Sequence, residues 1–250
     1  MEKISAVIIT KNEEKNIERC LNSLQWTDEI VIVDSGSVDK TIEICQRYEC
    51  KIITTEWLGF GKTKRLAADS AKYDWILSID ADEEISPGLK DRIKEIFLRG
   101  PKCNGYKIKR ISYYLDKRIK HSGWGKEYKL RLFNRKYGNF NERPVHESVT
   151  IKGETGAIQE PIYHYPYPTV KVHLKKMNLY AQIFAEEKSK KSKRSSITGA
   201  VFHSISKFIK MYFLQLGFLD GKVGLLLALN SAYGVFLKYV YLWETSRRYL

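Results

Sequence analysis

The sequence contains few cysteines, and those it has are poorly placed for a metal or disulfide framework. Its 250 residues include 4 cysteines, which form no C-x-x-C pair and have no histidine at zinc-finger spacing: Cys20, Cys45, Cys50 and Cys103. Neither a zinc knuckle nor a disulfide scaffold is indicated, and reduced thiols are the simplest interpretation. The start of the chain also lacks the basic, apolar and small-residue regions of a signal peptide. We therefore expect a cytoplasmic protein.

Acidic residues are scarce in the last third of the chain. Residues 165–250 hold 14 Lys and Arg against 4 Asp and Glu, whereas residues 1–164 hold 29 against 25, so ten of the fourteen excess positive charges lie in the last third. Such asymmetry indicates an anionic partner, either a membrane surface or a nucleic acid. No nucleic-acid-binding motif accompanies it, so we expect no nucleic-acid partner.

Long uncharged runs are also missing from this basic third. Fifteen uncharged residues separate Lys222 from Lys238, fewer than the ~20 that a spanning helix needs unless its ends snorkel. The basic run Lys188–Arg194 precedes Ile205–Leu216, an apolar segment with lysine on one side, which is typical of a helix in a bilayer interface. The aromatic residues of the last helix suit either that interface or a helix pair packed on the sheet domain.

Apolar strand patterns alternate with helical patterns through residue 98. Strands are predicted at Ile4–Ile9, Glu29–Asp34, Lys51–Thr54 and Trp75–Ile79, and helices over 17–24, 39–48, 62–73 and 86–97. Because parallel neighbours need crossover helices, the expected fold class is α/β with a mostly parallel, doubly wound sheet.

The pattern changes after this first part of the chain. From Gly105 to His164 it is β-rich, including Tyr106–Tyr114, Tyr128–Phe133 and Val145–Ile151, and from Thr169 onward it is helical. We therefore divide the chain into an α/β half at 1–104, a β-rich half of the same domain at 105–166, and a basic and apolar helical region at 167–250. The β-rich half is expected to receive a second substrate.

The most informative feature is an apolar strand that stops at four acids. Asp80, Ala81, Asp82, Glu83 and Glu84 follow the fourth predicted strand, at the carboxyl edge where open α/β sheets bind ligands. Side chains two apart on an extended chain point the same way, so Asp80 and Asp82 are expected to address one target while Ala81 faces elsewhere. A divalent cation shared with substrate phosphates fits such a pair, and a solvated strand end is the alternative.

Polar residues also follow the first two strands. Asp34 ends the second strand before a Ser35-Gly36-Ser37 turn, where it is expected to accept hydrogen bonds from a nucleobase or ribose while the turn lets the backbone approach a ligand. Thr10, Asn12 and Glu13 end the first strand and would face the same crevice. An Asx turn at Asp34 and a capped helix start at Thr10 or Asn12 are the structural alternatives.

Several of these segments, taken in order, resemble glycosyltransferase family 2: Ile8–Glu14, Val33–Thr41 and Asp80–Glu83. The likeness to its bacterial lipopolysaccharide-core β-glucosyltransferase branch continues through Trp57–Gly61, Gly123-Trp124, Arg131–Phe133, Val145–Glu147 and Gly217–Gly221. It spans nearly the whole chain, and it is more specific to the family than to the sugar transferred.

The resemblance implies a GT-A-type nucleotide-sugar transferase that inverts the anomeric carbon and uses Mg²⁺ or Mn²⁺. Asp82, Asp80 and His146 would bind the metal, and Asp80 with Ala81 would contact a UDP-hexose, most simply UDP-glucose. The acceptor would be a lipid-linked saccharide of the lipopolysaccharide inner core, at the inner face of the cytoplasmic membrane. Transfer to polyprenyl phosphate or a capsule precursor, and a non-catalytic nucleotide-binding module on a membrane surface, remain open.

Inversion requires a carboxylate that accepts the proton of the attacking hydroxyl. Glu147 is the expected base because it lies in the acceptor half beside Arg143 and His146, where flanking cations favour its ionised form. Family members often carry their base in a Glu-Asp pair that this chain lacks. Three further carboxylates therefore stay open as the base: Asp116, Glu127 and Glu142.

Two arginines, Arg65 and Arg131, complete the predicted site. Lys62, Lys64 and Arg65 begin a helix after a glycine-rich turn, and the resemblance favours Arg65 against the nucleotide. Arg131 alternates with apolar neighbours, as a strand residue facing a cleft does. A solvated helix face and a surface strand charge are the respective alternatives.

Overall fold

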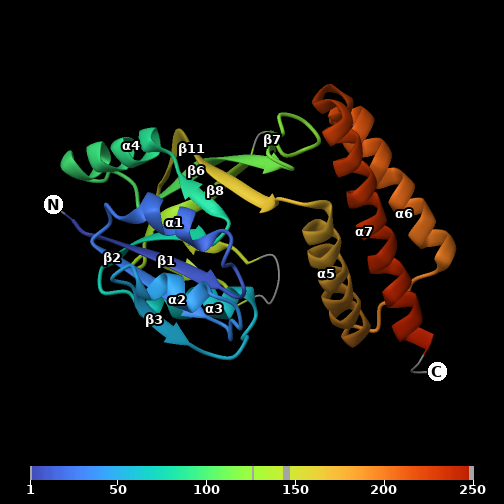
Figure 1. Cartoon of the computed structure of the whole chain (residues 1–250), viewed down its shortest axis with the longest axis horizontal. Helices are drawn as coiled ribbons and strands as arrows, with labels where there is room; N and C mark the ends of the chain where they lie inside the picture. The colour runs from blue at the N-terminus through green and yellow to red at the C-terminus, as the bar shows by residue number, and fades with distance from the viewer. Residues whose placement is uncertain (1, 126, 143–146, 248–250) are drawn as a thin grey trace. The chain divides into compact units, whose positions relative to one another are not determined.

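The computed structural model describes residues 2–125, 127–142 and 147–247. They form two compact units, which are described separately. The first contains the residues up to Arg110 together with Glu127–His164, and the second contains the segment from Ile111 to the loop before Glu127 together with the residues from Tyr165 onward. Figure 1 shows the elements of both.

A sheet of nine strands, counted over the described residues, contains most strands of the first unit, and one of its strands, at Lys117–Arg118, belongs to the second unit. Its order is β3-β2-β1-β4-β8-β6-β11-β5, and β7 pairs with β6. The strands are β1 Ile4–Thr10, β2 Glu29–Asp34, β3 Lys51–Thr54, β4 Trp75–Asp80, β5 Glu83–Ile85, β6 Gly105–Tyr114, β7 Lys117–Arg118, β8 Glu127–Asn134 and β11 Thr155–Tyr167. Two short strands, β9 Gly138–Phe140 and β10 Val149–Ile151, form a separate antiparallel pair.

The first four strands form the predicted parallel half. Strand β1 pairs in parallel with β2 and β4, and β2 pairs in parallel with β3. The helices between and after them are α1 Ile17–Leu24, α2 Thr41–Gln46, α3 Phe60–Asp69 and α4 Pro87–Leu98. Strand β8 is antiparallel to β4 and β6, and β5 is antiparallel to β11. The α/β expectation is therefore confirmed, with an antiparallel extension on one side.

Alternate side chains of the central strand enter two hydrophobic cores. Ala6 and Ile8 of β1 pack in a cluster with buried residues of α1, α2 and α4, whereas Val7 packs in a second cluster with Ala67 and Ala68 of α3. Because successive strand residues point to opposite faces, helices must cover both sides of the sheet. The carboxyl edge between these layers stays available for polar residues.

All four helices predicted in this half are present, but α2, predicted over 39–48, spans Thr41–Gln46, and the bounds of α3 also differ from the prediction. Ser86 caps α4 by accepting a hydrogen bond from Leu89 N at 3.2 Å, with Pro87 in the first turn, as expected. Helix α3 was predicted over 62–73 and instead spans Phe60–Asp69. Its C-terminal carbonyls receive hydrogen bonds from the distant Arg135 guanidinium, a contact that local sequence does not reveal.

The predicted β-rich segments agree in part with the structure. Tyr106–Tyr114 and Tyr128–Phe133 correspond to β6 and β8. Of the segment predicted at Val145–Ile151, the first two residues lie outside the described residues, and Val149–Ile151 form β10. The short strand β5 was not anticipated, because its residues belong to the acidic cluster.

The second unit is mainly helical. It contains α5 Val170–Lys190, α6 Ile197–Ile209, a π-helical turn at Lys210–Leu214, a 3₁₀ turn at Gly217–Asp220 and α7 Gly221–Arg247. Helices α5, α6 and α7 run side by side (Figure 1). One stretch among the described residues, Gly217–Arg247, is long and apolar enough to cross a membrane by length and composition alone.

The Gly217–Gly221 segment has a structural role in this unit. The buried Asp220 carboxylate accepts hydrogen bonds from Lys120 N at 3.1 Å and His121 N at 3.0 Å. A Cβ at Gly217 would lie 2.6 Å from the Met211 carbonyl oxygen, so only glycine fits there. The segment therefore holds the loop that contains Lys120 and His121 against the start of α7.

Candidate functional site

Three strands carry the predicted site residues to one edge of the sheet. Thr10 pairs with Asp34 across β1 and β2, and Ile9 pairs with Asp80 across β1 and β4. The carboxyl ends of these parallel strands are therefore in register. The predicted juxtaposition of the first-strand, second-strand and fourth-strand residues occurs in the structure.

Asp34 and Asn12 together hold the turn after β2. Asp34 is 1% exposed, and its Oδ2 accepts hydrogen bonds from Gly36 N at 2.9 Å and Ser37 N at 2.8 Å. Asn12 N donates to Ser37 Oγ at 2.8 Å, and Asn12 Oδ1 accepts from Val38 N at 2.8 Å. The Asx-turn alternative is thus present at Asp34, and it fixes the shape of the turn.

Two buried hydroxyl groups beside Asp34 have no hydrogen-bond partner within the described residues: Thr10 Oγ1 and Ser35 Oγ. Both side chains are almost fully buried, and Ser35 N donates to Thr10 O at 3.0 Å, which ties the two strand ends together. Unpaired buried hydroxyls cost stability unless a ligand or water satisfies them. Glu13 lies at the following helix start, where its carboxylate accepts from Asn16 Nδ2 at 2.8 Å.

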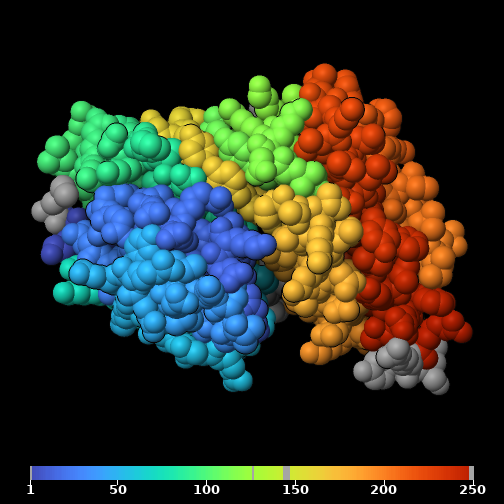
Figure 2. Space-filling view, in the orientation of Figure 1, coloured from blue at the N-terminus to red at the C-terminus, as the bar shows by residue number. Residues whose placement is uncertain are grey.

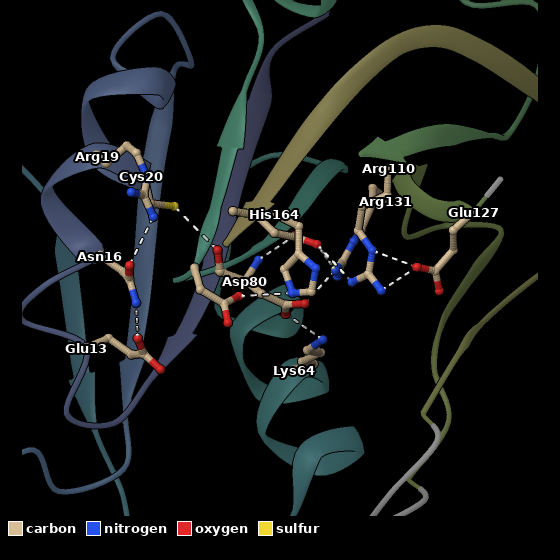
Figure 3. A network of polar contacts seen from close by, with 12 residues as sticks. Glu13, Asn16, Arg19, Cys20, Lys64, Asp80, Arg110, Glu127, Arg131 and His164 are labelled. Atoms are coloured by element: carbon tan, nitrogen blue, oxygen red, sulfur yellow. Dashed lines mark hydrogen bonds and ion pairs between the residues drawn. The ribbon is translucent and has the colours of Figure 1, made fainter. Parts of the chain in front are cut away.

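Asp80 is the centre of a network of charged side chains (Figure 3). Lys64 Nζ lies 2.7 Å from Asp80 Oδ1, and the Arg131 guanidinium lies 2.5 Å from Asp80 Oδ2. Although burial by itself raises the pKa of Asp80, the charges of Arg131 and Lys64 hold that pKa well below its usual range. Asp80 is therefore a permanent anion with a fixed orientation.

Glu83 belongs to the same network through its contacts with Arg131 and Arg110. Its side chain is fully buried, and its Oε1 lies 2.7 Å from the Arg131 guanidinium and 3.3 Å from that of Arg110. Its other oxygen accepts a hydrogen bond from Asp80 N at 3.0 Å. Burial lowers the pKa of Arg131, but Asp80 and Glu83 raise it overall, so Arg131 stays charged. Glu83 thus orients Arg131 toward Asp80.

Lys64 connects Asp80 to the candidate base. Its ammonium group lies 2.8 Å from Glu147 Oε1 as well as 2.7 Å from Asp80. Burial lowers the pKa of Lys64, and the two carboxylates outweigh this and raise it. The predicted cation Arg65 instead points to Asp69 at 3.6 Å and Glu142 at 3.7 Å. The structure thus joins Lys64, rather than Arg65, to the strand-end acid.

Asp82 lies beside His164 of β11. Asp82 Oδ1 is 3.6 Å from His164 Nε2, and both side chains are 13% exposed. Burial lowers the pKa of His164, with the Asp82 carboxylate acting in the opposite direction, so the imidazole is held in the neutral form that ligates metals. The Asp82 carboxylate oxygen is the kind of donor that Mn²⁺ and Mg²⁺ prefer, and the neutral imidazole nitrogen beside it is an additional available ligand.

The donor set is small without a substrate. No group of three or more His, Cys, Asp or Glu side chains arranged to hold a metal occurs in the part of the chain that the structure describes. Both carboxylate oxygens of Asp80 already contact cations. Asp82 and His164 therefore fit a metal that takes its remaining ligands from a diphosphate and water, which is the usual way that magnesium is held.

The expectation of an extended chain through the acids is wrong. Strand β4 ends at Asp80, and Ala81 and Asp82 form a turn before β5. As a result Asp80 faces Lys64 and Arg131, whereas Asp82 faces His164. Ala81 is buried in the core cluster. The two acids belong to one site but have different partners.

The remaining candidates are distributed as follows. Arg143 and His146 lie outside the described residues. Glu127 is held by Arg110, whose Nε lies 2.9 Å from its carboxylate, and Asp116 is exposed in a turn of the second unit. Glu142 pairs with Arg65. Among the base candidates, Glu147 alone contacts a partner of Asp80 within the described residues.

Arg110 and His164 were not predicted as members of this site, whereas Lys64 was named only beside the favoured Arg65, and Glu83 only as part of the acidic cluster. Lys64 lies three and four residues before Ala67 and Ala68 on the buried stripe of α3, so a charge on an apolar helix face was the available signal. His164 continues the row of Ile158 and Ile162 along β11 in the same way. For Glu83 the signal was its place in the acidic cluster itself.

Comparison with known proteins gives a consistent result. The model of the family described as "Glycosyl transferase family 2" matches residues 5–158. An uncharacterized glycosyltransferase of Rickettsia conorii is 32% identical, over 98% of this chain and 91% of the relative. The lipopolysaccharide core biosynthesis glycosyltransferase LpsC of Rhizobium meliloti is 27% identical, over 94% of this chain and 89% of the relative.

A solved structure shares the fold. The TarS protein of Staphylococcus aureus, crystallised in complex with UDP-GlcNAc, superposes with a TM-score of 0.50 at 17% identity, over 98% of this chain and 92% of that one. At this identity the likeness concerns the fold alone, which is of the GT-A type.

Proposed function

Because this chain belongs to glycosyl transferase family 2, we propose that it transfers glucose from UDP-glucose to a sugar of a lipopolysaccharide inner core, with inversion. That it is a glycosyltransferase follows from the family. The donor, acceptor and stereochemistry are the proposed part. The acceptor class is supported by the similarity to the Rhizobium meliloti core glycosyltransferase, and a UDP-linked donor by the fold shared with TarS, which binds UDP-GlcNAc.

One observation carries the mechanism. Lys64 Nζ bridges Asp80 at 2.7 Å and Glu147 at 2.8 Å, so the strand-end acid and the candidate base are joined through a single ammonium group. We assign the donor to residues 1–104, the acceptor to 105–166 and membrane association to 167–250. In this assignment the nucleotide lies over Thr10, Asp34 and Ser35, where two buried hydroxyls have no partner among the described residues.

Asp82 and His164 would hold Mg²⁺ or Mn²⁺. When bound, the ion neutralises negative charge that develops on the leaving diphosphate. The protein's own residues do the rest. Arg131 and Lys64 hold Asp80 ionised and fixed at the edge of the donor site. Glu83, fully buried, fixes Arg131 in turn.

Glu147 is proposed to accept the proton. The acceptor hydroxyl oxygen forms a bond to the anomeric carbon, the bond from that carbon to the diphosphate breaks, and the hydroxyl proton passes to the Glu147 carboxylate. Lys64 Nζ lies 2.8 Å from Oε1 of this carboxylate. The Lys64 contact also positions Glu147 relative to Asp80.

A depletion assay tests the acceptor. Purified protein is incubated with UDP-glucose and either lipid A–core or polyprenyl phosphate, and released UDP is measured. Turnover with lipid A–core alone is the expected result. Turnover only with polyprenyl phosphate would contradict the proposed acceptor, and UDP binding without turnover on either would favour a non-catalytic nucleotide-binding module.

A substitution tests the base. Glu147→Gln is expected to lower kcat by about 10²–10⁴-fold while UDP binding is retained. Glu154→Gln, at an exposed glutamate of the same unit, is the matched control and should keep full activity. Full activity in Glu147→Gln would transfer the role of base to another of the open carboxylates.

A further inference from the structure

A hollow of about 320 Å³ lies among helices α5, α6 and α7 of the second unit. Lys207 and His203 of α6, Lys210 of the following turn and Lys238 of α7 give it a basic lining. Its aromatic walls are also ordered by contacts: the His203 ring stacks on Tyr239 with centroids 4.3 Å apart, and the Lys238 ammonium lies 5.4 Å from the centre of the Phe184 ring.

The three lysines in this hollow have no acidic partner among the residues that the structure describes. Burial lowers the pKa of Lys207, and the charged neighbours that lower it further are Lys210 and Lys238. Burial also lowers the pKa of Lys238. By contrast, the buried Lys64 of the first unit contacts two carboxylates. Three cations that repel one another around a hollow are stabilised when an anion enters it.

The surface next to the hollow is unusually apolar. Of the 23 exposed large hydrophobic residues in the part of the chain that the structure describes, 14 lie between Ile197 and Tyr233. Phe202, 68% exposed, directly precedes His203, and Leu214, 74% exposed, ends the turn that contains Lys210. Helices α6 and α7, orange and red in Figure 2, form one continuous surface. Contiguous exposed apolar side chains mark an interaction site.

We propose that this hollow binds the phosphate of an anionic phospholipid headgroup while the exposed apolar side chains of α6 and the following turn enter the outer part of the acyl layer. Basic side chains beside an apolar helix face are the combination that a bilayer interface favours. The 14 to 4 excess of basic over acidic residues in 165–250 matches an anionic surface rather than a second copy of this basic region. No residue of the Asp80 network takes part, so the site stands independently of the proposed sugar transfer.

An interfacial position fits the spacing of the charged residues in α7 better than a spanning one. The fifteen uncharged residues between Lys222 and Lys238 cover about 22 Å at ~1.5 Å per residue, less than the ~30 Å of a hydrocarbon core. A spanning α7 would also draw Lys238, a lining residue of the hollow, toward the apolar layer.

Vesicle flotation tests the site with the full chain. Phosphatidylcholine vesicles are compared with vesicles that also contain phosphatidylglycerol, for the wild type and for the triple variant Lys207→Gln/Lys210→Gln/Lys238→Gln. The charge-matched control, Lys171→Gln/Lys175→Gln/Lys191→Gln, removes three exposed lysines of the same unit. UDP binding without lipid reports that each variant is folded.

The expected result is binding of the wild type to the phosphatidylglycerol vesicles, and a loss of at least about tenfold in the hollow variant beyond that in the control variant. Equal losses in both variants would show diffuse charge attraction and overturn the site. If all variants bind phosphatidylcholine alone as well, no anion is recognised and the proposal is likewise wrong.

A second variant separates a lipid surface from other occupants. Phe202→Ser/Leu214→Ser keeps every charge and should weaken vesicle binding while the protein stays monomeric in light scattering. Unchanged vesicle binding together with saturable binding of inorganic phosphate, measured by calorimetry, would assign the hollow to soluble phosphate instead. A wild-type dimer that this variant converts to a monomer would assign the apolar face to a second copy.

Discussion

Removing the Arg131 guanidinium should destabilise the protein strongly, because two carboxylates depend on it. Arg131 contacts Asp80 at 2.5 Å and Glu83 at 2.7 Å, and Glu83 is fully buried. Deleting one partner of a buried pair costs about 3–5 kcal/mol, since the other charge stays buried. Arg110 at 3.3 Å from Glu83 and Lys64 at 2.7 Å from Asp80 remain. We therefore expect Arg131→Met to cost about 3 kcal/mol, at the lower end of that range.

Urea unfolding measures this loss. The control Arg47→Met removes an arginine whose side chain is 56% exposed and whose contact with Glu18 is long, at 3.9 Å. Because such an exposed ion pair contributes little, the urea midpoint should stay unchanged. The double variant Arg131→Met/Glu83→Gln should be more stable than Arg131→Met alone, because it removes the uncompensated carboxylate. A cost below about 1 kcal/mol for Arg131→Met, or a double variant that loses the sum of both single losses, would refute the reasoning.

Three further predictions concern other parts of the fold. Burial lowers the pKa of His173 to about 4, below the ~6.5 of an unfolded histidine, so stability should fall as pH drops from about 6.5 toward 4, and His173→Gln should remove that slope in urea midpoints. Gly217→Ala places a Cβ 2.6 Å from a main-chain oxygen and should cost about 1–3 kcal/mol in urea unfolding, whereas Gly88→Ala, 3.6 Å from its nearest neighbour, should cost nothing. Burial raises the pKa of Cys45 to about 12 and that of Cys20 well above its usual value, so mass mapping should find neither thiol alkylated at neutral pH before unfolding.

The parallel half of the fold was predictable because its signals are local. Apolar runs such as Ile30–Val33, followed by helical periodicity, specify a strand and its crossover helix without knowledge of distant residues. The end of α3 was not predictable in this way. Arg135 donates to Ala68 O at 3.0 Å across 67 residues of sequence, and no local pattern reports such a contact.

In the site, too, the positions that depend on local sequence were predictable and the contacts that depend on tertiary packing were not. Asp34 and Asp80 could be found because each stands where an apolar strand ends, and the sheet register then brings them to one edge. Lys64, Arg131 and Glu147 were named from the sequence as well, but their contacts with Asp80 and with one another were not predictable, because the three residues come from separate elements whose meeting depends on tertiary packing. The choice of Arg65 over Lys64 relied on family resemblance, whereas helix periodicity favoured Lys64 as the buried residue.

The turn after β4 has a further consequence for interpretation. In an extended Asp80–Asp82 segment, both carboxylates would face the same ion. Because of the turn, Asp80 instead contacts Lys64 and Arg131, and Asp82 lies beside His164. We therefore propose that Asp80 organises the charges of the site and that Asp82 binds the metal. The two-residue spacing of the acids does not by itself distinguish these roles, since the directions of the two side chains depend on the backbone conformation between them.

The most direct test of the account is titration calorimetry of UDP with the purified protein, with and without Mn²⁺ or Mg²⁺. The account predicts that either ion strengthens UDP binding to the wild type and to the control Asp91→Asn, at an exposed aspartate of α4, and that Asp82→Asn loses the effect of the ion. UDP binding that no divalent ion changes, or an ion effect that survives intact in Asp82→Asn, would contradict it.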